Sequence, residues 1–485
     1  MSKNILYKLY ETLFKLLLLV IIASSCTNEE SNNEKKPNFL IMLADDMGYG
    51  DPACYGGVSQ TPNLNSLAEK GKRFTDFYAA APNCSPSRAG LLTGRAPSMV
   101  GIYSYRPPNH PMHLRSNEIT IAEILKNHGY QNSIFGKWHL GCLPQDSVLN
   151  HPQPDEQGFD YFFATENNAQ PSHLNPVNFV KNGEPLGEIK GYSCQIIAGE
   201  AISWLENHYK EEEPFFMYLP FHEPHAKVAS PPELVEKYNQ YPPKDAEYLA
   251  NIENLDLAIG QIIDYLKKKN IFNNTFILFA SDNGSYRKAS NGNLKAVKSY
   301  LYDGGIRVPG IIHWSALNNK SNNTIHEPAG LVDILPTICD ILKIDPPDDK
   351  IMDGTSILNL IKGENFNREN PLFWFFYRTS PEIAVRTGNF MIMGKDNDTI
   401  PRTHQFAARD MNYIKNMDIK KYELYDLSDD ISQSNNIFET HPDSNKYKKI
   451  VNDKLEEIQT QGYKWENLPL LENKRRILKT EFNKY

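Results

Sequence analysis

The sequence predicts an α/β protein, with one large and mostly parallel sheet flanked by helices and a smaller C-terminal α+β subdomain. Three observations indicate this fold class. Short apolar segments that read as buried strands alternate with capped helices through most of the chain. Polar residues follow the ends of these strands. Near 363–371 the pattern changes to strands joined by turns, which favours a separate small unit.

The predicted strands of the large domain are short apolar runs bounded by polar residues. They are expected at 38–44, 133–135, 215–221 and 275–280. The helices between them carry start and stop signals, such as Pro62 in a first turn and Gly71 at a C-terminus. They are expected at 62–70, 120–129, 198–209 and 248–269. Alternating strands and helices form parallel sheets, which bind ligands at the carboxyl ends of their strands.

The C-terminal part reads as a unit of its own. Strands are expected at 372–378, 384–394 and 421–430, and a final helix is expected to begin near Pro442. We therefore place the main domain at 37–365 and the C-terminal subdomain at 366–485.

The N-terminal residues are typical of an export signal. Lysines precede an apolar run at 16–23 that is too short for an ordinary membrane-spanning helix, and small residues lead to Cys26. This pattern predicts a lipoprotein signal peptide at 1–25 with lipidation at Cys26; the alternative is a plain secretory signal with a chance cysteine. The polar stretch 26–36 is expected to be a flexible tether. The protein would then be exported to the periplasm or outer membrane, with a lipid anchor in the membrane.

Net charge and cysteine usage restrict the possible partners of the protein and the chemistry of its cysteines. The formal net charge is -8, which argues against nucleic acid as a partner because no basic excess can neutralise phosphates. Beside Cys26 there are five cysteines without CxxC pairs or zinc-like spacing. An odd number in an oxidising compartment requires at least one cysteine with another fate. The five are Cys54, Cys84, Cys142, Cys194 and Cys339.

Two pairs of oxygen-bearing side chains follow predicted strands. Asp45 and Asp46 come directly after the first strand, and Asp282 and Asn283 follow the strand at 275–280. Such ligands suit Ca²⁺ or Mg²⁺ rather than zinc. Either pair alone is also what a polar turn at a strand end would look like. Because parallel strands present their carboxyl ends at one edge, we expect both pairs in one composite site.

A cysteine motif lies between these pairs. "CSPSR" at 84–88 has the form C-x-P-x-R. Pro86 is expected in the first turn of a helix, which places residue 84 at the helix N-terminus, where free N–H groups and the helix dipole favour an anion. Arg88 follows one turn later and could help to neutralise that anion.

These motifs resemble those of the type I sulfatases of the alkaline phosphatase-like superfamily. In that family a separate maturation enzyme oxidises the cysteine to formylglycine. The resemblance implies the alkaline phosphatase-like sulfatase fold and conversion of Cys84, which would account for the odd cysteine. Its matching blocks keep the family's order along most of the chain: the Asp pair, "CSPSR", "GKWHLG", "FHEPH", "SDNG", "LYDGGIRVP" and "ELYDL".

The resemblance also implies a mechanism. The aldehyde hydrate carries two hydroxyls, one to attack sulfur and the other to expel sulfate when it is deprotonated. One divalent ion, usually Ca²⁺ with Mg²⁺ as the alternative, would act as a Lewis acid. Its implied ligands are Asp45, Asp46, the converted Cys84, Asp282 and Asn283. The implied catalytic residues are Cys84, Arg88, Lys137, His139, His225 and Lys298.

Roles for four of these residues follow from the same resemblance. Lys137 would bind sulfate and His139 would assist its expulsion; on an extended segment, residues two apart point the same way. His225 would protonate the leaving oxygen, and Lys298 would bridge the sulfate and leaving oxygens. Each of the last two has a near rival in the sequence. The rivals are His222 and Lys295.

The function expected from these residues is sulfate-ester hydrolysis on a sulfated polysaccharide or its oligosaccharides. An algal glycan such as ulvan or carrageenan and an animal glycosaminoglycan both fit. One alternative is a phosphonate monoester hydrolase or phosphodiesterase of the same superfamily. Another is a glycan-binding lipoprotein without catalytic activity.

Overall fold

The structure is a computed structural model that describes residues 35–465 apart from 109, 148, 318–322, 369, 379–381, 397–405 and 407, together with residues 5, 7, 8 and 10–12. Residues 1–36 and 37–485 form separate units, and the second unit is described below. Cys26 and most of the predicted signal peptide and tether lie outside the described residues, so they stay predictions. Within the described part of the chain, we find no helix with the length and apolar character needed to cross a membrane.

One large mixed sheet forms the centre of the fold. Its strand order is β11-β2-β10-β9-β1-β8-β4-β5-β6-β7. The bounds are β1 (Asn38–Ala44), β2 (Lys72–Phe74), β4 (Gln131–Lys137), β5 (Tyr161–Thr165), β6 (Val180–Lys181), β7 (Glu184–Pro185), β8 (Phe215–Pro220), β9 (Thr275–Ser281), β10 (Gly310–His313) and β11 (Thr324–Ile325). Strands β9, β1, β8, β4 and β5 are parallel, and β10 and β6 join them in antiparallel orientation. The predicted parallel arrangement therefore holds at the centre of the sheet.

The central strand β1 shows why its sequence is apolar throughout. All of its residues are buried. Phe39, Ile41 and Leu43 belong to one hydrophobic core, whereas Leu40 and Met42 belong to the other. A strand that is covered on both faces needs apolar side chains at every position.

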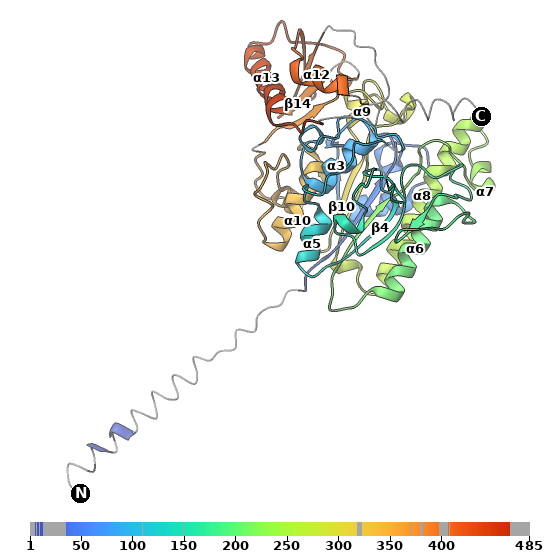
Figure 1. The fold of residues 1–485 in the computed structure, drawn as a ribbon, viewed down its shortest axis with the longest axis vertical. Helices are drawn as coiled ribbons and strands as arrows, with labels where there is room; N and C mark the ends of the chain where they lie inside the picture. Colours follow the sequence, from blue (N-terminus) through green and yellow to red (C-terminus); the bar gives the residue numbers. More distant parts are fainter. Residues whose placement is uncertain are drawn as a thin grey trace. The chain divides into compact units, whose positions relative to one another are not determined.

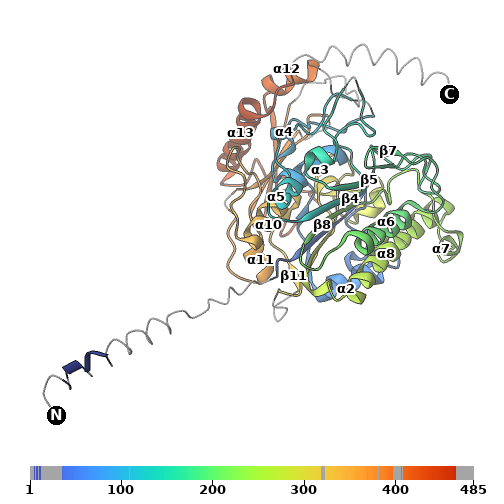
Figure 2. The same cartoon turned by 60° about the horizontal axis from the view of Figure 1, so that its bottom comes forward.

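Helices supply the two cores on either side of this sheet. The bounds are α2 (Pro62–Lys70), α3 (Cys84–Thr93), α4 (Pro97–Val100), α5 (Ile121–Asn127), α6 (Ser193–His208), α7 (Pro232–Glu236), α8 (Pro243–Lys268), α9 (Asp303–Ile306), α10 (Ile334–Leu342), α11 (Leu358–Lys362), α12 (Ala408–Asn416) and α13 (Ser444–Gln461). α2, α6 and α8 pack on one face, and α3, α5 and α10 pack on the other (Figures 1 and 2).

The C-terminal part is a four-stranded antiparallel sheet with the order β13-β14-β15-β16. Its bounds are β13 (Leu372–Phe375), β14 (Ile383–Thr387), β15 (Phe390–Lys395) and β16 (Lys421–Asp426). It packs on the main part of the chain: Trp374 in β13 donates its indole N–H to the carbonyl of Ala79 at 2.7 Å. The fold class predicted from the sequence is therefore confirmed. The boundary at 365/366 stays a prediction.

Most predicted elements form, with differences at their ends. The segment expected as a strand at 384–394 instead forms the two antiparallel strands β14 and β15, joined by a turn. α6 begins at Ser193 and α8 at Pro243, each earlier than expected. For α8 the reason is a proline in the first helical position, where its missing N–H costs nothing. The predicted strand 372–378 ends at Phe375, because the chain leaves the ladder there.

Candidate active site

A cavity of about 520 Å³ brings together side chains that follow the central strands and the N-terminus of α3. This volume lies within the range of small-molecule sites, about 300–1,000 Å³. Five of the residues predicted from the sequence line it. They are Cys84, Lys137, His139, His225 and Lys298.

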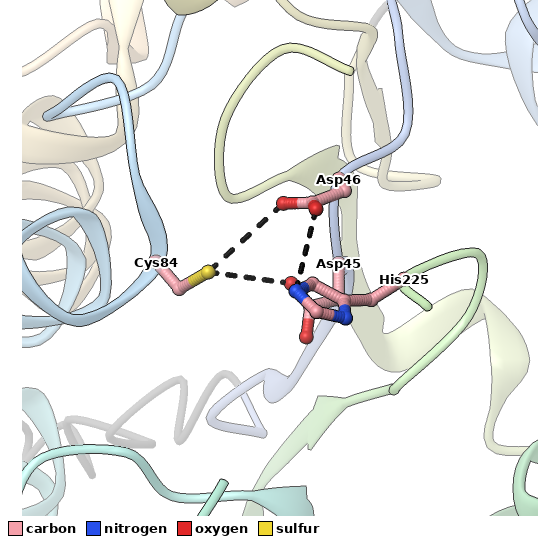
Figure 3. A group of neighbouring side chains, drawn as sticks. All are labelled: Asp45, Asp46, Cys84 and His225. Carbon is pink, nitrogen blue, oxygen red and sulfur yellow. Dashed lines mark hydrogen bonds and ion pairs between the residues drawn. The ribbon is translucent and has the colours of Figure 1, made fainter. Parts of the chain in front are cut away.

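Cys84 is the first residue of α3, as the motif predicted. Asn83 before it is extended, so the chain turns into the helix at residue 84. The thiol is 1% exposed. Its Sγ lies 3.5 Å from Asp45 Oδ1 and 4.0 Å from Asp46 Oδ1 (Figure 3). The residue that the family converts thus faces the carboxylates at the end of β1.

Arg88 links the helix to the second acidic pair. Its Nε and Nη2 atoms donate to one oxygen of Asp282 at 3.0 and 2.7 Å, and Nη1 donates to the carbonyl of Lys137 at 2.9 Å. The side chain is fully buried. Because its donors are engaged with the protein, Arg88 holds α3 against the ends of β9 and β4 and supplies a fixed positive charge beneath the cavity.

The two acidic pairs come together as predicted. Asp46 has a left-handed backbone with φ of 66°, and its N–H donates to Asp282 Oδ1 at 3.2 Å. Asn283 donates its side-chain N–H to Asp46 Oδ1 at 2.7 Å. Its own Oδ1 is buried and has no hydrogen-bond partner in the described structure. An unpartnered buried acceptor beside carboxylates is suited to a cation.

The donor set therefore fits a hard divalent ion. Asp45, Asp46, Cys84 and His225 each offer one ligand atom within 4.8 Å of the others, and Asp282 and Asn283 adjoin them. The sequence did not predict His225 in such a group. Carboxylate and amide oxygens prevail among these atoms, which favours Ca²⁺ or Mg²⁺ over softer metals.

Two lysines balance the carboxylates. Lys137 Nζ donates to Asp45 Oδ2 at 2.7 Å, and Lys298 Nζ contacts both oxygens of Asp46 at 2.6 and 2.9 Å. Burial alone would raise the pKa of Asp45, but the charges of Lys137, His225, Arg88 and Lys298 together hold it well below its usual value. The surrounding positive charges therefore favour the ionised form of Asp45.

His139 presents one defined nitrogen to the site. Its Nε2 lies 2.8 Å from the carbonyl of Arg106, which can only accept, so Nε2 carries the proton and Nδ1 is the free base. Nδ1 is buried and without a hydrogen-bond partner in the described structure. Burial, together with Lys137 and Arg88, holds the pKa of His139 well below its usual value.

Lys137 and His139 were expected to point the same way along one extended segment, but the structure brings them into one cavity differently. The extended segment ends at Lys137, and His139 has a left-handed backbone with φ of 59°. The two side chains meet because the chain turns, not because they alternate along a strand.

The two histidines of "FHEPH" have different surroundings. His225 lines the cavity, and its Nε2 lies 3.5 Å from Asp46 Oδ2. His222 is fully buried, with Nε2 2.7 Å from Thr165 Oγ1 and Nδ1 2.6 Å from Ser193 Oγ. Both nitrogens of His222 are thus occupied within the fold, which favours His225 as the reactive residue.

The two candidate lysines separate in the same way. Lys298 Nζ lies 3.4 Å from Cys84 Sγ. Lys295 instead donates to Tyr425 Oη at 3.1 Å and to the carbonyl of Gln433 at 2.9 Å, away from the cysteine. Ser299 donates its N–H to the carbonyl of Pro82 at 2.8 Å, which ties the loop of Lys298 to the turn before α3.

Sequence reasoning missed the remainder of the cavity wall. These residues are aromatic, amide or hydroxyl side chains, with one arginine, and they lie outside the recognised motifs. They are Asn83, Tyr105, Asn167, Asn168, Ser299, Tyr300, Phe376 and Arg378. Asn83 directly precedes Cys84, but no local pattern distinguishes the other residues from surface or core residues, because only the tertiary fold brings them into the cavity.

The five cysteines within the described residues form no disulfides with one another. Cys54, Cys84, Cys142, Cys194 and Cys339 are all free thiols. Burial raises the pKa of Cys84 to about 12, although Lys137 and Lys298 oppose this. The unmodified thiol is therefore protonated near neutral pH, and a thiol is a far weaker nucleophile than a thiolate.

A polar cavity at the carboxyl edge of a parallel sheet, with a reactive residue at a helix N-terminus, is the arrangement of an α/β enzyme. Comparison with known proteins identifies the class further: residues 37–344 match the Sulfatase family profile, and residues 296–461 match the profile "N-sulphoglucosamine sulphohydrolase, C-terminal". The chain belongs to the sulfatase family, whose members are hydrolases.

Individual relatives agree with this assignment. The chain is 32% identical to N-acetylgalactosamine-6-sulfatase of Rattus norvegicus over 389 residues, which cover 73% of this chain and 70% of the relative. It is 30% identical to Arylsulfatase A of Homo sapiens over 443 residues, or 83% of each chain. Among solved structures, Ps i-CgsB in complex with k-i-k-neocarrahexaose superimposes with a TM-score of 0.74 at 24% identity, covering 93% of this chain and 99% of that one.

Proposed function

We propose that this protein is a formylglycine-dependent sulfatase that hydrolyses sulfate esters of a sulfated glycan. The observation that carries the proposal is the position of Cys84. It begins α3, and it lies beside the carboxylates of Asp45 and Asp46 and the ammonium group of Lys298. A converted residue at this place would have anion-binding N–H groups and cations on one side and metal ligands on the other.

The chemistry is divided between the chain and two groups that it would carry. The formylglycine hydrate would supply a hydroxyl nucleophile, and a divalent ion held by Asp45, Asp46, Asp282 and Asn283 would supply a Lewis acid.

The residues around this centre have complementary tasks. Lys137 and Lys298 line the cavity as cations and would bind the sulfate oxygens. Nδ1 of His139 is a free base and would accept a proton from a hydroxyl at residue 84. His225, on the cavity wall, would donate a proton to the leaving oxygen.

A glycan is the substrate class that we favour. Two relatives point to it by name, an N-acetylgalactosamine-6-sulfatase and a structure that binds k-i-k-neocarrahexaose. The cavity adds aromatic and amide side chains, among them Tyr105, Asn167 and Asn168, which suit the ring faces and hydroxyls of a sugar. We further propose that lipid at Cys26 anchors the exported enzyme in the periplasm or at the outer membrane.

The test is sulfate release, measured by ion chromatography after co-expression with a formylglycine-generating enzyme. The substrates are intact and lyase-digested ulvan, carrageenan, chondroitin sulfate and heparan sulfate. We expect release from at least one of them, loss of that release in Cys84→Ala, and retention in Cys54→Ala, a matched control outside the cavity. Equal release by wild type and Cys84→Ala would refute the mechanism.

A second substrate pair separates sulfate from phosphorus chemistry. The wild-type protein should hydrolyse an aryl sulfate faster than the matched aryl phosphonate. The opposite preference would identify a phosphonate hydrolase and overturn the proposal.

A further inference from the structure

One guanidinium in the cavity wall is buried but incompletely hydrogen-bonded. Arg378 follows β13 and lines the cavity together with Phe376. It is 8% exposed, and its Nε and Nη2 atoms have no hydrogen-bond partner among the residues that the structure describes. Buried donors in proteins are rarely left without an acceptor, so this pair of atoms is suited to an acceptor from a ligand.

The two atoms also have the right geometry for an oxyanion. Nε–H and Nη2–H lie along one edge of the planar guanidinium and point the same way. This edge can donate two parallel hydrogen bonds to a carboxylate or to two oxygens of a sulfate. A single neutral hydroxyl would occupy only one of the two donors.

The charge of Arg378 is less fully matched than the charges of the cavity lysines. Its Nη2 lies 3.6 Å from Asp410 Oδ2, beyond hydrogen-bond distance, and the same oxygen accepts from Tyr377 Oη at 3.1 Å. Lys137 and Lys298 by contrast contact their carboxylates at 2.7 and 2.6 Å. Arg378 is therefore a cation that can still accept a full oxyanion partner.

Arg378 belongs to a different part of the cavity from the sulfate-binding group. The cations at Cys84 are Lys298, whose Nζ lies 3.4 Å from Sγ, and Lys137, whose Nζ donates to Asp45 at the end of β1. Arg378 comes instead from the C-terminal part, next to the ring of Phe376. A saccharide whose sulfate lies at residue 84 would place its other substituents along this wall.

We propose that Arg378 binds a second oxyanion, a carboxylate or a second sulfate, on the saccharide that carries the scissile sulfate. The natural substrate is then a saccharide with at least two negative groups. This inference rests on the proposed function, because it takes the sulfate ester to lie at Cys84.

The test compares matched disaccharides with the same scissile sulfate. One has no other charge, one carries a hexuronate, and one carries a second sulfate. Wild type should prefer one or both charged forms, and the preferred form identifies the oxyanion. In Arg378→Gln, kcat/KM for that form should fall about 10–100-fold more than for the neutral form, mainly through KM, with partial recovery in Arg378→Lys. An equal fall on all three disaccharides, or no fall, would overturn the inference.

Asp410→Asn is the matched control. It removes the ion-pair partner of Arg378 but leaves the guanidinium in place, so the preference for the charged disaccharide should persist. If Asp410→Asn reproduces the loss seen in Arg378→Gln, Arg378 acts only through its ion pair, and the inference is wrong.

A binding measurement keeps this inference distinct from the proposed function. Calorimetry on Cys84→Ala, which cannot convert residue 84, should show tighter binding of the charged disaccharide, and Arg378→Gln in that background should remove the difference. If Cys84→Ala binds the charged disaccharide more tightly but the wild-type protein releases no sulfate, the proposed function alone is refuted. Sulfate release without dependence on Arg378 would refute the inference alone.

Discussion

At the scale of single residues, the proposed role of His139 as a base depends on which of its two ring nitrogens is free. The carbonyl of Arg106 accepts from Nε2, and the backbone N–H of His139 donates to the carbonyl of Glu166 at 2.9 Å. The ring is thereby fixed in one tautomer and one orientation. His222, which follows β8, instead has both ring nitrogens engaged by hydroxyls. The two buried histidines therefore differ in whether a ring nitrogen is free to accept a proton, because their hydrogen-bond partners differ.

The histidine assignment gives a direct prediction. His139→Asn keeps an acceptor near the position of Nδ1 but has no basic atom, so kcat should fall about 100–10,000-fold. His222→Asn should instead lower the urea midpoint of unfolding, since it loses at least one buried hydrogen bond. Steady-state kinetics and urea unfolding on both variants measure this split. Wild-type kcat in His139→Asn would exclude it as the base.

At the scale of elements, the first turn of α2 is held by a side chain from another helix, α8. α2 begins at Pro62, and Thr61 before it makes no capping bond through its side chain. Asp256 of α8 replaces the cap. It accepts from the backbone N–H groups of Asn63 at 3.1 Å and Leu64 at 2.8 Å. A long-range carboxylate thus satisfies the free N–H groups of the first turn of α2 and ties it to α8.

This tie predicts a measurable stability difference along one helix. Asp256→Ala should lower the free energy of unfolding by about 1.5–3 kcal/mol, because it removes hydrogen bonds to a buried charged group. Asp264→Ala is the control: Asp264 lies on the same helix, and its side chain is 75% exposed. Its effect should stay within about 0.5 kcal/mol. Equal urea midpoints for the two variants would contradict the account.

The secondary-structure elements could be predicted from the sequence more completely than the cavity wall, for physical reasons. β1, β9 and α2 could be predicted to within a residue, because buried strands and capped helices carry their signals locally. The sequence motifs also indicated which residues share a cavity: Cys84, Lys137, His139, His225 and Lys298 all line it, although their roles stay predictions. Phe376 and Arg378 could not be predicted as cavity residues. The apolar run of β13 continues past Phe375 in the sequence, so it gives no local sign that the strand ends there.

At the scale of the whole molecule, the cavity is built from the main sheet and the C-terminal part together. Gln433 shows the connection: its side-chain carbonyl accepts from the N–H of Asp303 at 2.8 Å, and its backbone carbonyl accepts from Lys295 at 2.9 Å. The loop that carries Lys298 is therefore supported by the C-terminal part. The proposed reacting groups follow strands of the large sheet, and the C-terminal part adds Phe376 and Arg378, for which we propose a role in substrate recognition.

The central claim is that residue 84 must be converted for sulfate esters to be hydrolysed. The most direct measurement pairs the mass of the peptide containing residue 84 with the rate of aryl sulfate hydrolysis, in preparations made with increasing amounts of the maturation enzyme. The account predicts a rate proportional to the aldehyde fraction and no turnover by the unconverted thiol. A rate that does not depend on the aldehyde fraction would contradict it.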